Sequence, residues 1–334
     1  MTHSILPPDW QLSEAHITPE STYWHRRQVL KTLFGASATL SLLPLMGCRS
    51  QAQAPSASTT RDPLTQTYDL PEIAPLRTNL DFATVDRPIT SQNLASQYNN
   101  FYEFGGTKSI WKRAQDLPTE DWQVEVTGLV NNPKTYDLDD LRRTFEHEER
   151  VYRFRCVEAW SMVLPWVGFP MYKLLETADP KSSAKFVQFT SFYDRQITPG
   201  PGLHLGSLPW PYREGLRIEE MANELAFFAT GIYGKELPKQ HGAPIRMVVP
   251  WKYGFKGAKS IVKIEFVAEQ PATYWNTLIP HEYGFEANVN PAKSHPRWSQ
   301  TQERFIGPGE TLTWEVKETL PYNGYGDYVA HLYA

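Results

Sequence analysis

Short alternations of apolar and polar residues run through the chain after about residue 90 and indicate a domain rich in strands. Between Asp121 and Val130, the apolar residues Trp122, Val124 and Val126 alternate with other residues, which is typical of a strand with one buried face. Further strand-like stretches cover 151–156, 185–192, 226–230, 245–249 and 260–267. We expect residues 311–334 to return as closing strands.

The helical patterns are fewer and shorter. Asp137 precedes two leucines spaced three apart and can cap a short helix whose first turn is acidic, where the helix dipole favours negative charge. A second helix is expected to start at Pro170, and a third covers 218–225. Strands and helices do not alternate regularly, and Pro and Gly interrupt the loops. The pattern therefore predicts an α+β fold, mixed and β-rich, that forms a single domain over residues 91–334.

The first 48 residues have the layout of an export signal. Arg26 and Arg27 precede an uncharged run, 32–48, that is too short for a comfortable membrane span. The paired arginines resemble the twin-arginine signal, which exports proteins that have already folded. The predicted location of the mature chain is therefore the periplasm.

The end of this signal leaves two outcomes open. Leu45-Met46-Gly47-Cys48 resembles a bacterial lipobox, although Met46 departs from the small residue expected there. Either Cys48 is acylated and anchors the chain to a membrane, or cleavage occurs further on, near residues 51–58. The stretch 49–90 is rich in Pro, Ser, Thr, Gln and Ala, and we expect a linker followed by an arm laid over the domain.

Composition excludes several classes of protein. The net charge is −4 and no long basic run occurs, so nucleic acid is not an expected partner. Aromatic residues make up 13% of the chain, which is too much apolar surface for a disordered protein. The 2 Cys cannot form a disulfide scaffold, a four-cysteine zinc site, a self-contained iron–sulfur cluster or a haem attachment motif. No flavin, nicotinamide or serine-hydrolase fingerprint is present, and the nine His residues lack zinc spacing.

The stretch 152–170 combines a thiol, a carboxylate and several aromatic rings. In an extended chain, Tyr152, Phe154, Cys156 and Glu158 share one face. Two interpretations are open at this point: a chemically active thiol beside a carboxylate, or a buried free cysteine with a solvated Glu nearby. Taken alone, the residues favour the second, because free Cys is among the most buried residue types.

The same stretch resembles the metal-binding segment of the sulfite oxidase family of molybdenum enzymes, in which one cysteine thiolate ligates a molybdenum held by a pyranopterin. The resemblance covers nearly everything after about residue 95 and is closest to a periplasmic branch that reduces methionine sulfoxide. Its motifs occur in the family's order and cover 98–105, 155–161, 242–246, 251–257, 287–291 and 295–300.

The resemblance implies one Mo-molybdopterin per chain and a set of residues that hold it. Cys156 is the expected molybdenum ligand, since a soft thiolate is a suitable donor. Arg246 and the turn Gly257-Ala258-Lys259 are expected to meet the phosphate and the hydrogen-bonding edges of the pterin. The remaining residues expected to line the cofactor are Asn99, Tyr102, Glu103, Ser191 and His241.

Two of these lining residues depart from the branch pattern. Ser191 stands where Thr is found and keeps the hydroxyl. His241 stands where Asn is found and keeps one donor and one acceptor only while its ring is neutral. Glu158 is a candidate to position water or relay protons, and an acid role near neutral pH would need a raised pKa.

The implied reaction is two-electron removal of a sulfoxide oxygen, with methionine sulfoxide as the substrate, free or on an exposed protein segment. Trp160, Trp251 or Tyr253 could pack the thioether arm, or could equally be core. Electrons are expected from a membrane-embedded haem b subunit fed by quinol. The rival interpretations are a sulfite oxidase-like or other S- or N-oxide oxidoreductase, and a non-catalytic exported binding protein.

Overall fold

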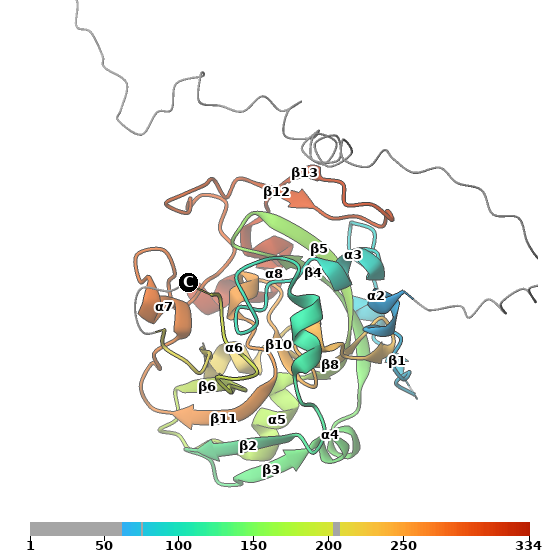
Figure 1. Ribbon diagram of the computed structural model, residues 1–334. Coiled ribbons are helices and arrows are strands. Elements are labelled where there is room, and N and C mark those ends of the chain that lie inside the picture. The colour runs from blue at the N-terminus through green and yellow to red at the C-terminus, as the bar shows by residue number, and fades with distance from the viewer. Residues whose placement is uncertain (1–61, 75, 203–207) are drawn as a thin grey trace, which may run out of the picture. The chain divides into compact units, whose positions relative to one another are not determined.

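Two β-sheets form the frame of the protein in a computed structural model that describes residues 62–74, 76–202 and 208–334 (Figure 1). Mixed sheets with short helices between them confirm the predicted α+β fold. The predicted export signal and Cys48 lie outside the described residues. No helix among the described residues combines the length and the apolar character that a membrane crossing needs.

The larger sheet is organised around β5 (Trp160–Pro170), a long curved strand whose residues are all buried. It pairs antiparallel with β4 (Glu148–Arg155) and parallel with β12 (Gln302–Phe305). Through its second half it also pairs with β8 (Phe227–Ile232). The other strands of this sheet attach to these and are β1 (Arg77–Thr78), β9 (Lys235–Glu236), β10 (Arg246–Val248) and β13 (Glu315–Glu318).

The smaller sheet has five strands in the order β3-β2-β11-β6-β7. Their bounds are β2 (Gln123–Gly128), β3 (Lys134–Asp137), β6 (Phe186–Ser191), β7 (Arg213–Arg217) and β11 (Ile261–Val267). The alternation of Val124 and Val126 with exposed residues is the burial pattern expected of β2, because only one face of that strand meets the core.

Short helices connect and cover the sheets. Asp137 caps α4 (Leu138–Thr144) by accepting a hydrogen bond from the Asp140 amide, as predicted. α5 (Met171–Ala178) begins one residue later than expected, with Pro170 as its N-cap. The other α-helices are α2 (Pro63–Gln66), α3 (Gln92–Gln97), α6 (Ile218–Ala222), α7 (Tyr274–Leu278) and α8 (Gly326–Val329). Short 3-10 helices cover Leu80–Phe82, Ile110–Asp116, Lys239–His241, Gly254–Lys256, Pro321–Gly324 and Ala330–Tyr333.

The C-terminal segment differs from the prediction of closing strands. Only β13 is a strand, and the chain after Pro321 forms helical turns that include α8. The buried residues Tyr325 and Val329 are four apart, which places both on one side of a helix.

Residues 62–90 lie against the larger sheet. Phe82 is buried, and its ring lies 5.9 Å from Tyr152 and 4.4 Å from the Arg150 guanidinium. β1 adds a short parallel pairing to β4. The division of the chain at residues 48 and 90 stays a prediction.

Candidate functional site

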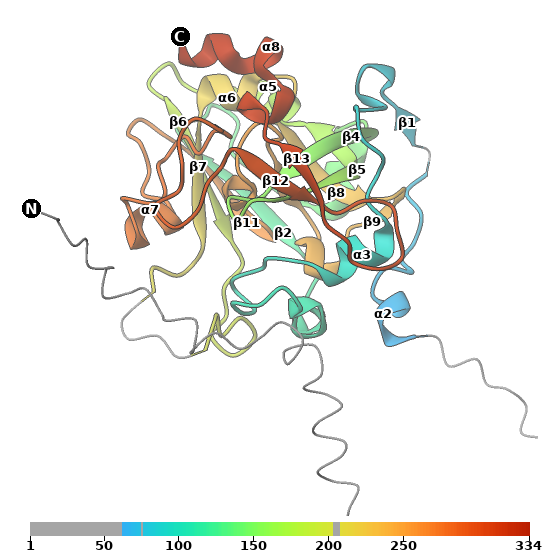
Figure 2. The same cartoon turned by 90° about the horizontal axis from the view of Figure 1, so that it is seen from above.

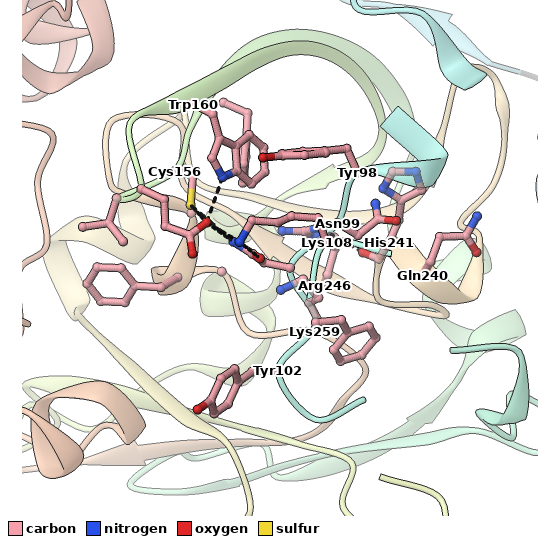
Figure 3. A pocket seen from close by; sticks show the side chains of 18 of the residues that line it. Tyr98, Asn99, Tyr102, Lys108, Cys156, Trp160, Gln240, His241, Arg246 and Lys259 are labelled. Atoms are coloured by element: carbon pink, nitrogen blue, oxygen red, sulfur yellow. Dashed lines mark hydrogen bonds and ion pairs between the residues drawn. The ribbon is translucent and has the colours of Figure 1, made fainter. Parts of the chain in front are cut away.

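A deep cavity lies between the turn that joins β4 to β5, the segment 95–108 and the segment 240–259. It encloses about 1090 Å³ including its open mouth. Ten Phe, Trp and Tyr residues contribute to its wall, and charged and thiol side chains lie at its two ends (Figure 3). Cys156 marks one end, and Arg246, Lys259 and His241 mark the other.

Cys156 lies in the β4–β5 turn and not in a strand. β4 ends at Arg155, the Cys156 amide donates to the Trp160 carbonyl at 2.9 Å, and Ala159 has a left-handed φ of 62°. The expectation of one shared strand face from Tyr152 to Glu158 is therefore wrong, since the chain reverses after Cys156. Burial raises the pKa of the Cys156 thiol to about 12, so a soft metal would have to displace a proton to bind there.

A segment remote in sequence holds this turn by its backbone. Trp298 Nε1 and Gln300 Nε2 both donate to the Val157 carbonyl at 2.7 Å. Arg155 donates to the Cys156 carbonyl, to Gln300 Oε1 at 2.8 Å and to Glu303 at 2.9 Å. We call these four side chains, of Arg155, Trp298, Gln300 and Glu303, the turn clamp.

Glu158 is held by three donors at the mouth of the cavity. Its Oε2 lies 2.9 Å from Asn100 Nδ2, 2.9 Å from Trp160 Nε1 and 2.5 Å from Lys108 Nζ. The same oxygen is 3.7 Å from Cys156 Sγ. Burial acts to raise the pKa of Glu158, but the three donors outweigh it and the net pKa is lowered. This environment keeps the carboxylate ionised and is the opposite of what an acid role near neutral pH requires.

The other end of the cavity carries two cations, Arg246 and Lys259. Arg246 is buried, donates to the His241 carbonyl at 2.9 Å and lies 4.8 Å from the Trp166 ring. In the described part of the chain, neither Arg246 nor Lys259 has a carboxylate within ion-pair distance. Burial lowers the pKa of Arg246 to about 10 and, together with Arg246, that of Lys259 to about 8. Buried cations without a counterion are costly, so this end suits an anionic group such as a phosphate.

Three buried polar atoms beside these cations lack a hydrogen-bond partner among the described residues: Asn99 Oδ1, Trp166 Nε1 and His241 Nε2. Asn99 uses its Nδ2 on the Ala95 carbonyl at 2.8 Å. Burial, with Arg246 and Lys259, lowers the pKa of His241 to about 3, so its ring is neutral. A neutral ring offers one donor and one acceptor, as an amide side chain at this position would.

Glu103 and Tyr102 line the cavity next to Lys259. Burial raises the pKa of Glu103 to about 7, opposed by Lys259 and by the nearby Ser191. Glu103 is therefore only partly ionised near neutral pH and compensates only part of the positive charge of Arg246 and Lys259. Ser191 is buried at the end of β6 and does not line the cavity. The Tyr102 ring lies 4.8 Å from Trp275.

The turn after the Gly254–Lys256 helix approaches Arg246 closely. Gly257 lines the cavity, and a Cβ at this position would lie 2.8 Å from the Met247 carbonyl and 3.2 Å from Arg246 Nη2. Ala258 is buried, accepts from the Met247 amide with its carbonyl and does not line the cavity. Of the residues predicted to hold the cofactor, Ser191 and Ala258 are thus the two that do not line the cavity.

Several wall residues escaped the sequence analysis. Asn100 and Lys108 contact Glu158, and Tyr98, Trp166 and Gln240 complete the wall. Asn100 stands inside a quoted motif, so its position could have been noted. Trp160 lines the cavity, whereas Trp251 is buried in the core and donates to the Tyr333 hydroxyl at 2.8 Å. Tyr253 also lies outside the wall.

The residues present fit a molybdopterin. A soft thiol stands at one end for the metal, and uncompensated cations with unpaired polar atoms stand at the other for a phosphate and a heterocycle. The distance between the two ends is bridged by an aromatic wall that can pack a flat ring system.

An open groove continues from the mouth of the cavity to the surface. The two share the residues Tyr98, Tyr102, Lys108, Glu158, Trp160, Trp275 and Tyr283. Beyond them the groove is lined by Arg297 and Trp298, and by Arg304 and Val316 of the paired strands β12 and β13.

Comparison with known proteins agrees with this chemistry. Residues 112–275 match the family model of the oxidoreductase molybdopterin binding domain. The protein-methionine-sulfoxide reductase catalytic subunit MsrP of Burkholderia mallei (strain ATCC 23344) is 46% identical over 326 residues, which is 96% of this chain and 93% of that protein. The crystal structure of the sulfane dehydrogenase SoxCD from Paracoccus pantotrophus matches with a TM-score of 0.43 and 18% identity, over 66% of this chain and 56% of that chain.

Proposed function

Because the chain belongs to the MsrP-type catalytic subunits within the sulfite oxidase family of molybdopterin oxidoreductases, we propose that it reduces methionine sulfoxide, both free and protein-bound. The observation that carries the proposal is the cavity itself, which has the buried thiol of Cys156 at one end and, at the other, two cations that form no ion pair within the described residues. A non-catalytic binding protein would not need a thiol held at that place by a turn clamp.

The bound cofactor would supply the two-electron chemistry that removes the sulfoxide oxygen. Cys156 would hold the molybdenum through its thiolate. Arg246 and Lys259 would neutralise the phosphate, and the neutral His241 ring and Asn99 Oδ1 would pair with polar edges of the pterin. Glu103, Tyr102 and Gly257 complete the wall around it, with Ser191 and Ala258 behind them.

Lys108 and Glu158 would position the substrate at the mouth of the cavity. An ammonium group has three N–H donors, and Lys108 uses two of them on Glu158 at 2.5 Å and on Asn100 Oδ1 at 2.7 Å. The third can donate to a sulfoxide oxygen or to a water. Because Glu158 is ionised, its part is to fix Lys108 rather than to act as an acid.

The family resemblance and the N-terminal sequence support a proposal for the partner and the location. The paired Arg26 and Arg27 support export of the folded chain to the periplasm, where oxidised proteins would be its substrates. A membrane-embedded haem b subunit fed by quinol would donate the electrons. A mass measurement on the mature N-terminus distinguishes acylation at Cys48 from cleavage near residues 51–58.

One experiment tests the function. Purified protein is assayed for bound molybdenum and pterin. Its activity is measured in two separate assays: oxidation of a reduced dye by methionine sulfoxide, and reduction of an oxidised dye by sulfite. We expect turnover with methionine sulfoxide only. In Cys156→Ser, pterin should remain bound while turnover falls by at least about a thousandfold, because the hydroxyl is a poor ligand for a soft metal. Retained turnover in that variant, or turnover with sulfite alone, would refute the proposal.

A further inference from the structure

Exposed apolar side chains gather in one short stretch of chain beside the groove. Of the eight large apolar residues that are exposed among the described ones, four lie between residues 312 and 320: Leu312, Trp314, Val316 and Leu320. Val316 leaves 60% of its surface exposed. Single exposed apolar residues are ordinary, whereas a group of them marks a surface that binds something.

The strand register ties this stretch to the active-site mouth. Trp160 of β5 pairs with Arg304 of β12, and Arg304 pairs with Val316 of β13. All three residues line the groove. Because neighbouring strands lie about 4.8 Å apart, Val316 stands roughly 10 Å from Trp160 along one face of the sheet.

Trp314 connects the stretch to the cavity wall. Its ring lies 5.5 Å from Tyr98, which lines both the cavity and the groove, and 5.1 Å from the Arg304 guanidinium. Both Figure 1 and Figure 2 show the chain between β12 and β13 passing beside α3, after which Tyr98 follows. Trp314 is nevertheless 38% exposed, so its packing leaves part of the ring available.

β13 also presents an edge. Among the described residues it pairs only with β12, so its outer backbone groups face away from the sheet. The neighbours of Val316 in the strand, Glu315 and Lys317, form an ion pair at 2.6 Å and point to the other face. The apolar side of the strand is therefore the side that faces the groove.

We propose that Trp314 and Val316, here called the rim face, bind the apolar residues that flank methionine sulfoxide in an extended polypeptide. The proposal rests on the proposed function and names its substrate class. A methionine side chain is short, so its own backbone must enter the groove for the sulfoxide to reach the cavity, and the neighbouring residues then lie over the rim. Oxidation of a methionine from a core disrupts that core and exposes its apolar neighbours. An edge strand with an apolar side suits an extended chain of this kind.

The test compares substrates in one enzyme. Loaded wild-type protein, Val316→Asp and Trp314→Asp are assayed by dye oxidation with free methionine sulfoxide and with an extended peptide that carries one methionine sulfoxide between Leu and Val residues. We expect the ratio of kcat/KM for the peptide to kcat/KM for the free amino acid to fall about tenfold in each variant, through KM. The matched control Leu80→Asp, at an apolar residue that is 85% exposed and lines neither the cavity nor the groove, should leave the ratio unchanged.

A binding measurement separates this inference from the proposed function. Fluorescence anisotropy with the same peptide, dye-labelled, reports binding without turnover. One outcome would refute the function but support the rim face: wild-type protein binds the peptide, both rim variants bind it about tenfold more weakly, and no sulfoxide is reduced. If the peptide-to-free ratio and the anisotropy of the variants equal those of wild type, the rim face is overturned. The same holds if the variants lose only electron uptake from a quinol-linked partner.

Discussion

The two ends of the cavity are built on opposite principles. At the Cys156 end, the polar groups have partners: Glu158 accepts from three donors, and the side chains of the turn clamp donate hydrogen bonds to the carbonyls of the turn. At the Arg246 end, two cations have no carboxylate within ion-pair distance and are offset only in part by Glu103, and three buried polar atoms lack a hydrogen bond among the described residues. The first end is therefore complete without a ligand. The second end is completed by a ligand. Its unpaired polar groups destabilise the cofactor-free protein, and binding of the cofactor offsets this loss of stability.

The sharpest way to break this contrast is to remove a cation at the incomplete end. Arg246→Met should weaken retention of the cofactor by about a hundredfold, since the phosphate loses a buried charge partner. The same change should stabilise the cofactor-free protein by about 1 kcal/mol, because a buried charge without a counterion is replaced by an apolar side chain of similar length. Pterin content after dialysis and urea unfolding of the cofactor-free protein measure the two effects.

A surface arginine provides the control for Arg246→Met. Arg142 forms an ion pair with Glu236 at 2.6 Å, with both side chains more than a third exposed. Arg142→Met removes the same charge and should change neither quantity by more than about 0.5 kcal/mol. If Arg246→Met destabilised the cofactor-free protein, the cation end would be complete without a ligand and the contrast would be wrong.

At the Cys156 end, we expect a substitution in the turn clamp to lower the stability of the cofactor-free protein, which is the opposite of the effect expected at Arg246. Gln300 is buried and makes two hydrogen bonds, to the Val157 carbonyl at 2.7 Å and from Arg155 at 2.8 Å. Gln300→Ala removes both of these buried hydrogen bonds, one of them to a charged group, and should lower the free energy of unfolding by about 2 kcal/mol, with or without cofactor. Ser299→Ala, at the exposed neighbour, should stay within about 0.5 kcal/mol of wild type. Equal urea midpoints for Gln300→Ala and wild type would show that the clamp does not hold the turn.

The smallest expected effect is a pH dependence at His241. Its pKa falls from an ordinary 6.5 to about 3 in the folded chain, because burial and the two cations disfavour the charged ring. Between these values the unfolded chain binds a proton that the folded chain does not, so stability falls as the pH falls below 6.5. From pH 7.5 to 5.5 the cofactor-free wild type should lose about 1 kcal/mol more than His241→Asn. Equal losses in the two proteins would mean that His241 is not held neutral by its surroundings.

The strands were predictable from the sequence because a strand with one buried face shows alternating apolar and polar residues in its own sequence. Val124 and Val126 show the period of two directly, and the cap at Asp137 is a local signal. The β4–β5 turn was not predictable in this way. Residues 156–159 contain no Gly or Asn, and Ala159 adopts its left-handed φ of 62° because the surrounding ladder imposes it.

The site was predictable to the extent that its motifs are local. The segment around Cys156 and the turn at Gly257 could be recognised by residue type, yet the pairing of Glu158 with Lys108 depends on how 98–108 folds over the turn. That fold lowers the pKa of Glu158, where the sequence left a raised value open. Single-sequence patterns carry no signal for such contacts, because they join residues about fifty positions apart.

The clamp has a consequence for the order in which the protein is made. Gln300 and Trp298 hold the turn of Cys156 from more than 140 positions further along the chain. While the ribosome is still synthesising that last tenth of the protein, the thiol lies in an unbraced turn, and a chain that terminates early never braces it. The metal end of the site can therefore be braced only when translation is nearly finished.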